Sequence, residues 1–241
     1  MSKKTEKDKK VPIAFLVGAG SRFPAILNEA KKPNALFRIC VVISHKKESP
    51  KGVDLAQKEG LPAFYSNFVQ LKTKFGGKLE RKVYDQWLGA LLTQSNYAPT
   101  GVFMAGWDLV VSESFLNFFA RDDGFWNVIN LHPALLPDGN LPNYKTLAGV
   151  TIPALRGVDC LEAAWRQKLP VTGVTIHFAT PTFDVGPVIL IEEIKPDYKG
   201  ETFDKFAKRF HELEDKLLVE SINLFATNKL KIKNGKVKIL S

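Results

Sequence analysis

An amide and an imidazole stand two residues apart in the segment Asn130-Leu131-His132-Pro133. Residues i and i+2 of a strand point to the same face, so Asn130 and His132 share a face if this segment ends a strand. Pro133 cannot continue a paired ladder, which predicts that the strand stops there and an exposed loop begins. Because α/β enzymes keep their chemistry at such strand ends, this pair is the first candidate for a catalytic site.

A carboxylate that could serve His132 occurs in the segment Phe183-Asp184-Val185-Gly186-Pro187. If Asp184 reaches His132 from this turn, it would raise the pKa of the imidazole and fix its tautomer. A general acid or base near neutral pH needs both effects. The alternative is a turn or N-cap aspartate unrelated to the histidine, and spacing alone leaves both interpretations open.

A glycine-containing loop, Gly18-Ala19-Gly20-Ser21-Arg22, follows the first expected strand and precedes a helix. Glycines let the backbone approach a ligand, and the N–H groups of the next helix favour a phosphate. The loop lacks the third glycine of dinucleotide-binding loops and the lysine of nucleoside-triphosphate loops, so neither NAD nor ATP is implied. A tight turn without a ligand is the alternative.

Further ionisable groups gather on two expected helices: Arg81, Tyr84 and Asp85 on one, and Arg209, His211 and Glu214 on the other. Such residues ordinarily form a solvated face or helix-surface ion pairs, and the spacing alone favours that interpretation.

The composition indicates one large α/β domain with a full core, since 45% of the 241 residues are hydrophobic and 24% are charged. Cys40 and Cys160 are too few for a disulfide framework, so we expect reduced thiols in a cytoplasmic protein. No stretch of about 18 apolar residues predicts a membrane span. The net charge of +9 is a weak indication of anionic ligands, because the lysine-rich termini explain it as well as a nucleic-acid surface does.

Short apolar runs alternate with segments of helical period, which predicts a Rossmann-like α/β fold. Its mostly parallel, twisted sheet would carry helices on both faces and an antiparallel C-terminal addition. The expected strands are residues 11–17, 38–44, 63–65, 101–105, 128–131, 171–178 and 187–194. The expected helices are residues 24–30, 53–59, 79–94, 114–120, 159–167 and 202–226.

The helix at 79–94 is expected to bury an apolar face that includes Val83 and Trp87. Residues 138–153 are rich in Gly, Pro and Asn and are expected to form a long lid or binding loop. Asn234-Gly235 predicts a tight hairpin over 232–237. The domain organisation is therefore a disordered basic tail at 1–10, a single domain at 11–230 and a C-terminal hairpin or tail at 231–241.

From residue 11 to about 230 the chain resembles the phosphoribosylglycinamide formyltransferases, folate-dependent enzymes of purine synthesis, within the wider formyltransferase fold. The segments that carry the resemblance are 18–21, Arg81 with Tyr84-Asp85, 105–107, 130–137, 173–178, Asp184 with Gly186-Pro187, and Glu214. The Asn-x-His-Pro and Asp-x-Gly-Pro blocks are common to relatives of this fold. The glycine loop and Glu214 indicate the phosphoribosylglycinamide formyltransferases among these relatives.

The resemblance implies that an amine attacks the formyl carbon of 10-formyltetrahydrofolate. Asn130 would donate to the oxyanion, His132 would act as acid and base, and Asp184 would hold His132 in its charged form. His177, inside a strand, would be a core or supporting histidine.

It also implies substrate contacts for three further groups of residues. Gly18, Ala19, Gly20, Ser21 and Arg22 would bind the substrate phosphate. Glu214 and His211 would lie near the amine or ribose. The folate would contact Arg81, Trp107, Asp108, Leu109, Val110, Val111 and Asn130. No metal, nucleic acid or membrane is implied, and the enzyme would be a cytoplasmic monomer or homodimer that acts on small molecules.

Three positions depart from the family pattern. Arg22 replaces a small polar residue, and Asp108-Leu109 stands where methionine and arginine are common. Asp159 replaces the usual histidine, and the loop before it is longer than usual, so the chain differs from the family at the substrate entrance.

Other interpretations stay open. A formyltransferase acting on a sugar-nucleotide amine would use the same Asn130, His132 and Asp184. A methionyl-tRNA formyltransferase would need a C-terminal β-barrel domain, and a formyltetrahydrofolate hydrolase an N-terminal regulatory domain, and the chain is not expected to supply either. A catalytically inactive binding protein is disfavoured because the three residues are intact.

Overall fold

The computed structural model describes residues 10–46 and 51–240, which form two compact units. The first unit ends at Ile129 and the second begins at Asn130, so strand β5 (Val128–His132) carries the chain from one to the other. Apart from Lys10, the predicted disordered tail at 1–10 lies outside the described residues.

The first unit is built on parallel strands: β1 (Val11–Val17), β2 (Phe37–Ser44), β3 (Ala63–Tyr65) and β4 (Gly101–Ala105). Their order is β3-β2-β1-β4. β4 is buried along its whole length, as expected of a strand covered on both faces. The chain moves from β1 to β2 on one side and returns to β4 on the other. Loops after β1 and β4 therefore flank the point where ligands bind in such sheets.

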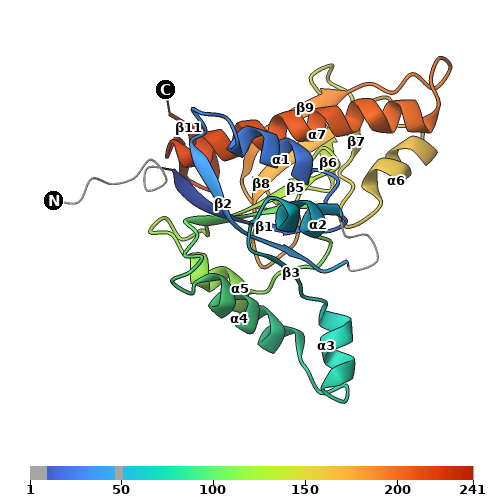
Figure 1. Cartoon of the computed structure of the whole chain (residues 1–241). Helices are drawn as coiled ribbons and strands as arrows, with labels where there is room; N and C mark the ends of the chain where they lie inside the picture. Colours follow the sequence, from blue (N-terminus) through green and yellow to red (C-terminus); the bar gives the residue numbers. More distant parts are fainter. Residues whose placement is uncertain (1–9, 47–50, 241) are drawn as a thin grey trace. The chain divides into compact units, whose positions relative to one another are not determined.

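Helices cover both sides of these strands. In Figure 1, α1 (Phe23–Ala30) and α2 (Lys51–Lys58) lie on one side of β1 and β2. The other side carries α4 (Arg81–Leu92) and α5 (Glu113–Leu116), the latter continued by a short 3-10 turn at Asn117–Phe119. Pro24 stands in the first turn of α1, where its missing N–H costs no hydrogen bond.

Two predictions for this unit were incomplete or wrong. Helix α3 (Phe68–Lys74) was not predicted, although Asn67 caps it by accepting a hydrogen bond from the Gln70 N–H. On α4, Val83 and Trp87 are exposed, whereas the buried face consists of Tyr84, Asp85, Leu88, Gly89 and Leu92. The predicted buried face was one residue too early along the helix, because a charged residue such as Asp85 was not expected to be buried.

In the second unit the strand order is β5-β8-β9. Strands β8 (Thr172–Phe178) and β9 (Val188–Ile194) pair antiparallel, which confirms the predicted antiparallel addition. Every residue of β8 is buried. The long helix α7 (Phe203–Ala226) packs against β8 and β9 and begins at Thr202, whose side chain accepts from the Lys205 N–H. Helix α6 (Cys160–Arg166) precedes β8.

The prediction of a long loop at 138–153 is wrong in part. The segment contains an antiparallel hairpin of β6 (Asn143–Lys145) and β7 (Thr151–Pro153). Tyr144 and Ile152 pack against Leu135 and Val171, so this hairpin has apolar anchors that its Gly, Pro and Asn content concealed. At the tip of the hairpin, the Leu147 N–H donates a hydrogen bond to the Glu193 side chain at 2.7 Å.

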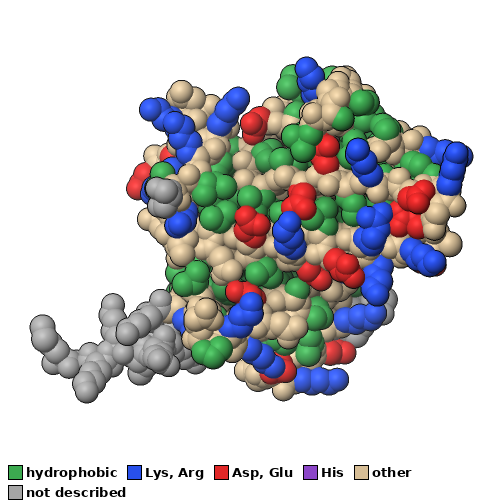
Figure 2. Space-filling model, turned by 90° about the horizontal axis from the view of Figure 1, so that it is seen from above, with side chains coloured by type: hydrophobic (Ala, Val, Ile, Leu, Met, Phe, Trp, Pro, Cys, Tyr) green, Lys and Arg blue, Asp and Glu red, His purple; other side chains and the backbone are tan. Residues whose placement is uncertain are grey.

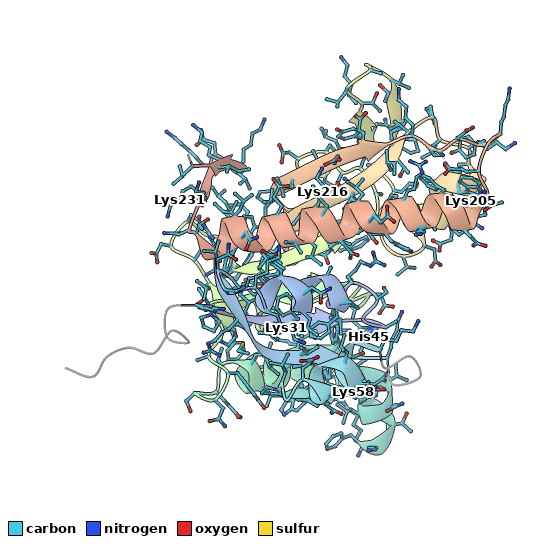
Figure 3. The ribbon with its side chains drawn as sticks, turned by 45° about the horizontal axis from the view of Figure 1, so that its top comes forward. Lys31, His45, Lys58, Lys205, Lys216 and Lys231 are labelled. Carbon is cyan, nitrogen blue, oxygen red and sulfur yellow. The ribbon has the colours of Figure 1, made fainter. Side chains whose placement is uncertain are left out.

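The C-terminal hairpin forms as predicted from Asn234-Gly235, with β10 (Leu230–Lys233) antiparallel to β11 (Lys236–Ile239). Lys231 lies opposite Lys238, and Lys233 lies opposite Lys236. Opposed residues share a face, so exposed lysines gather on one side of this hairpin, where Figure 3 labels Lys231. On the face in Figure 2, by contrast, Lys and Arg are interspersed with Asp and Glu.

Both cysteines, Cys40 and Cys160, are free and buried, as expected of reduced thiols. Within residues 10–46 and 51–240, none of the helices combines the length and the apolar character that a membrane crossing requires.

Candidate functional site

The second unit begins with the predicted pair at the end of β5. Asn130 is half-buried, and His132, the last residue of the strand, is 2% exposed. The polypeptide leaves the strand at Pro133, as predicted. Asn130 and His132 therefore lie at the carboxyl end of the strand, on one face.

Asp184 reaches His132 from its turn between β8 and β9. Its Oδ1 lies 3.4 Å from His132 Nδ1, and both side chains are buried. Asp184 adopts a left-handed conformation with φ of 56°, which is uncommon for a residue other than glycine. The geometry agrees with a carboxylate that serves the histidine and not with an unrelated turn residue.

A backbone carbonyl fixes the tautomer of His132. Its Nε2 lies 2.8 Å from the carbonyl oxygen of Leu155, which can only accept a hydrogen bond. Nε2 therefore carries the hydrogen, and in the neutral ring Nδ1 holds the lone pair that faces Asp184. Nδ1 is thus the nitrogen of His132 that can take up a proton.

Burial and the neighbouring charges act in opposite directions on the pKa values of His132 and Asp184. Burial lowers the pKa of His132 by more than Asp184 and the Leu155 carbonyl raise it. Asp184 thus favours the charged form of His132 as predicted, but burial opposes it in the unliganded site. Burial raises the pKa of Asp184, but the neighbouring His177 and His132 rings and the hydrogen bond from the Gly157 N–H outweigh it and hold that pKa below its usual value. The site pairs a neutral imidazole with a carboxylate.

His177 orients the amide of Asn130. The Nδ1 of His177 donates to the Phe178 carbonyl at 2.9 Å, so Nε2 accepts from Asn130 Nδ2 at 3.2 Å. This arrangement leaves the second N–H of the Asn130 amide for another acceptor. His177 is 2% exposed within β8, which agrees with the prediction of a core or supporting histidine.

The segment 155–157 contacts both His132 and Asp184, although no role was predicted for it from the sequence. The Leu155 carbonyl accepts from His132, Arg156 Nε donates to the Asp184 carbonyl at 3.0 Å, and the Gly157 N–H donates to Asp184 Oδ2 at 2.8 Å. Two of these contacts use backbone groups, which leave no mark in a sequence. Only the departure at Asp159 drew attention to this region.

Cys160 lies beside the pair, with its Sγ 3.7 Å from His132 Nε2. Burial, with a smaller effect from Asp184, raises the pKa of Cys160 to about 12. It is therefore a thiol and not a nucleophilic thiolate.

In the first unit, the glycine loop is shaped by close backbone packing. A Cβ on Gly18 would lie 2.2 Å from the Gly106 carbonyl oxygen, and one on Gly20 would lie 2.3 Å from Gly52. Gly20 also has a φ of 83°. The glycines are therefore required by the fold of the loop, and phosphate binding by Gly18 to Arg22 stays a prediction.

An ion-pair cluster that was not predicted lies beside this loop. The carboxylate oxygens of Asp108 lie 2.6 Å from His45 Nε2 and 2.6 Å from Lys46 Nζ. The rings of Trp107 and His45 form an edge-to-face contact with centroids 4.7 Å apart. Trp107 Nε1 is buried and has no acceptor among the described residues. Figure 3 shows His45 just beyond β2.

Arg81 and Asp85 do not form the surface ion pair that the spacing favoured. Asp85 is fully buried and accepts from Arg81 Nε at 2.7 Å and from the Ser112 N–H at 2.8 Å. Arg81 also donates to the Val110 carbonyl at 2.5 Å. This network fixes the segment after Trp107, in which Val111 is buried, Leu109 half-buried and Val110 half exposed.

His211 and Glu214 form an ion pair on α7, with Nδ1 and Oε2 2.8 Å apart. Glu214 is buried, whereas the His211 side chain is 45% exposed. His211 therefore lies at the helix surface, as the spacing favoured, whereas the Glu214 carboxylate does not. Within residues 10–46 and 51–240, no three His, Cys, Asp or Glu side chains group as metal ligands would.

Comparisons with known proteins show which family the chain resembles in sequence and in fold. The family model described as "Formyl transferase" matches residues 11–222. A phosphoribosylglycinamide formyltransferase of Dictyostelium discoideum is 28% identical over 217 residues, covering 88% of this chain and 96% of that protein. The crystal structure of glycinamide ribonucleotide transformylase 1 from Symbiobacterium toebii superposes with a TM-score of 0.77 at 25% identity, covering 96% and 95% of the two chains.

Longer relatives also match. The trifunctional purine biosynthetic protein adenosine-3 of Bos taurus is 27% identical over 233 residues, which cover 95% of this chain. The chain spans only 20% of that protein's length.

Proposed function

Because the chain belongs to the formyl transferase family, we propose that it transfers the formyl group of 10-formyltetrahydrofolate to the amine of 5-phosphoribosylglycinamide, a step of purine synthesis. The observation that carries the proposal is the cluster of Asn130, His132 and Asp184 at the end of β5. The names of the full-length relatives support the choice of acceptor.

The proposed reaction forms a bond between the acceptor nitrogen and the formyl carbon and breaks the bond from that carbon to N10 of the folate. The attacking amine loses a proton, and N10 gains one. His132 can carry this proton, since its Nε2–H is held by Leu155 and its Nδ1 lone pair is available. Its lowered pKa favours the neutral form that the first step requires.

Asn130 and Asp184 stabilise the charges that develop. The tetrahedral intermediate carries an oxyanion, and the free N–H of the Asn130 amide would donate to it, an interaction typically worth about 3 kcal/mol. Once Nδ1 is protonated, Asp184 stabilises the imidazolium from 3.4 Å. The carboxylate thus acts after proton uptake and not in the resting site.

Further substrate contacts follow from the family resemblance. Gly18, Ala19, Gly20, Ser21 and Arg22 would bind the phosphate, and Glu214 with His211 the amine or ribose. The folate would contact Arg81, Asn130 and the residues Trp107, Asp108, Leu109, Val110 and Val111. The hydrogen bond from Arg81 to Val110 supports a fixed shape for the latter segment.

We further propose a cytoplasmic enzyme that acts as a monomer or homodimer on small molecules and not on nucleic acid. The other activities of the trifunctional relatives are not part of the proposal. 10-Formyltetrahydrofolate is a formyl donor consumed in the reaction, and no metal is required by the proposed steps.

The test is to offer 10-formyltetrahydrofolate to the full chain with three acceptors in parallel: phosphoribosylglycinamide, an amino-sugar nucleotide and methionyl-tRNA. The proposal predicts a kcat/KM that is highest for phosphoribosylglycinamide. Preference for the amino-sugar nucleotide would assign the same catalytic cluster to another acceptor, and preference for the tRNA would contradict the small-molecule assignment.

A further inference from the structure

We propose that Arg156 is a positioning residue that sets Asp184 against His132. The inference rests on the proposed function, because it concerns the geometry of the same catalytic cluster. It assigns Arg156 no contact with the substrate. Its task is to hold the carboxylate at the distance from which it can stabilise a protonated imidazole.

Arg156 joins separate segments of the second unit through one side chain. Its Nε donates to the Asp184 carbonyl at 3.0 Å, and its Nη2 donates to the carbonyls of Gly139 and Leu141 at 3.3 and 2.9 Å. All three acceptors are backbone oxygens of irregular segments. A guanidinium with fixed donor directions can specify such a geometry, whereas a lysine has a single charged point on a flexible stem.

The backbone conformation of the Asp184 turn needs stabilising contacts from outside the turn. Asp184 has a φ of 56°, a conformation that costs free energy in a residue with a Cβ. Two further residues on, a Cβ on Gly186 would lie 1.8 Å from the Phe178 carbonyl oxygen, so the turn is tightly confined on that side. Arg156 supplies the hydrogen bond to the main chain at the strained residue itself.

The neighbours of Arg156 complete the hold on the pair. The Gly157 N–H donates to Asp184 Oδ2 at 2.8 Å, and the Leu155 carbonyl accepts from His132 Nε2 at 2.8 Å. A displacement of Arg156 would therefore move the partners of both catalytic side chains together.

A second link connects the same turn to the segment before β6. Asp138 Oδ1 accepts from the Val188 N–H at 3.1 Å, beyond the end of the Asp184 turn. Together with the bonds from Arg156 to Gly139 and Leu141, this ties residues 138–141 to the turn at two points. The longer segment at 138–153 is thereby coupled to the position of the carboxylate.

The charges that face His132 allow the proposal to be tested without substrate. Asp184 raises the pKa of the ring, whereas His177 and Arg156 lower it, and the neutral Cys160 thiol lies at 3.7 Å. If Asp184 moves away, the pKa of His132 falls. Loss of the Arg156 charge alone would act in the opposite direction.

The experiment compares the full chain with Arg156→Lys, Arg156→Met and the matched control Arg166→Met, an exposed arginine at the end of α6. The pKa of His132 is measured by NMR titration of the histidine ring protons, with the resonance assigned by its absence in His132→Asn. We expect a downward shift in Arg156→Met, a smaller one in Arg156→Lys, and none in the control. Because lysine retains the charge, a downward shift in Arg156→Lys reports geometry alone.

The same variants are assayed for formyl transfer. Arg156→Met is expected to lose up to about 10²-fold in kcat, the scale on which a misplacement of about 1 Å acts, with KM values nearly unchanged. Arg156→Lys should recover part of the loss. An unchanged or raised pKa of His132, or equal effects in Arg166→Met, would overturn the inference. If Arg156→Met does not fold, the titration of Arg156→Lys decides.

These readouts separate the two proposals. A parent chain that is inactive toward phosphoribosylglycinamide contradicts the proposed function, whereas the NMR titration still tests the positioning role. An active parent with an unaltered titration in both Arg156 variants contradicts only the positioning role.

Discussion

Replacing Asp184 by asparagine removes the charge that faces His132 and little else. Asparagine is nearly isosteric, and it adopts the left-handed conformation of this position more readily than most residues do. Its side-chain oxygen can still accept from the Gly157 N–H, which is 2.8 Å from Asp184 Oδ2. The variant therefore tests the electrostatic role of Asp184 with the turn preserved.

The separation of 3.4 Å between Asp184 Oδ1 and His132 Nδ1 sets the size of the effect. At an effective dielectric constant of about 20, two unit charges at that distance attract by about 5 kcal/mol. Only part of this is gained in the transition state, because the imidazolium is partly formed there and because solvent and the substituted amide compensate for some of the loss. A decrease in kcat of about 10²- to 10³-fold is expected, at about 1.36 kcal/mol for each factor of ten.

The assay measures kcat and kcat/KM for transfer to phosphoribosylglycinamide across the acidic to neutral pH range, with folate binding and the melting temperature as controls for folding. Neutral His132 is the base, so kcat/KM should fall as the pH falls through its pKa, which burial places below the ordinary value of 6.5. Asp184 raises that pKa, so its loss should move the midpoint to a lower pH. A kcat equal to that of the parent, or a midpoint moved upward, would exclude this electrostatic role of Asp184.

Two further substitutions test the glycine loop and the C-terminal hairpin. Gly20→Val places a side chain against the Gly52 backbone at a φ of 83°, which strains the loop by about 1–3 kcal/mol. Steady-state kinetics should show a larger rise in KM for the phosphoribosyl substrate than for the folate, and equal rises would remove the loop from the phosphate site. Lys238→Glu faces Lys231 across the C-terminal hairpin and should stabilise the fold by roughly 0.5 kcal/mol. Thermal melts should show this gain disappear in high salt. It should be absent in the control Lys78→Glu, at an exposed lysine of the first unit outside any strand. A gain that persists in salt would exclude cross-strand repulsion as its cause.

The sequence was most informative where a local pattern determines the structure. The alternation of apolar strands and helices predicted the parallel strands of the first unit and the antiparallel pairing of β8 with β9. Period two along β5 and the stop at Pro133 correctly placed Asn130 and His132 together at a strand end. Asn234-Gly235 correctly predicted the last hairpin because its turn chemistry is local.

Patterns of composition failed where tertiary contacts decide the outcome. Residues 138–153 contain the β6–β7 hairpin, whose Tyr144 and Ile152 pack with Leu135 and Val171 outside the segment. Asp85 is buried because Arg81 and the Ser112 N–H satisfy its oxygens, which spacing along a helix cannot reveal.

In the candidate site, too, some features could be predicted from the sequence and others could not. The types and spacing of Asn130 and His132 identified this pair, whereas Asp184 was assigned to it only through the family resemblance. Neither indicated the protonation of the histidine. That depends on its burial and on the Leu155 carbonyl, a backbone group with no sequence signal. The roles given to Gly18 to Arg22, Glu214 and the folate-contacting residues stay predictions.

Following the formyl group itself tests both the proposed transfer and the role of His132. Parent chain and His132→Asn are each mixed with 10-formyltetrahydrofolate labelled in the formyl carbon and with phosphoribosylglycinamide, and the products are separated. We expect label on the glycinamide nitrogen with the parent chain and none with His132→Asn, although that variant still binds folate. Transfer by His132→Asn at the parent's rate, or a parent chain that leaves the label on folate, would contradict this expectation.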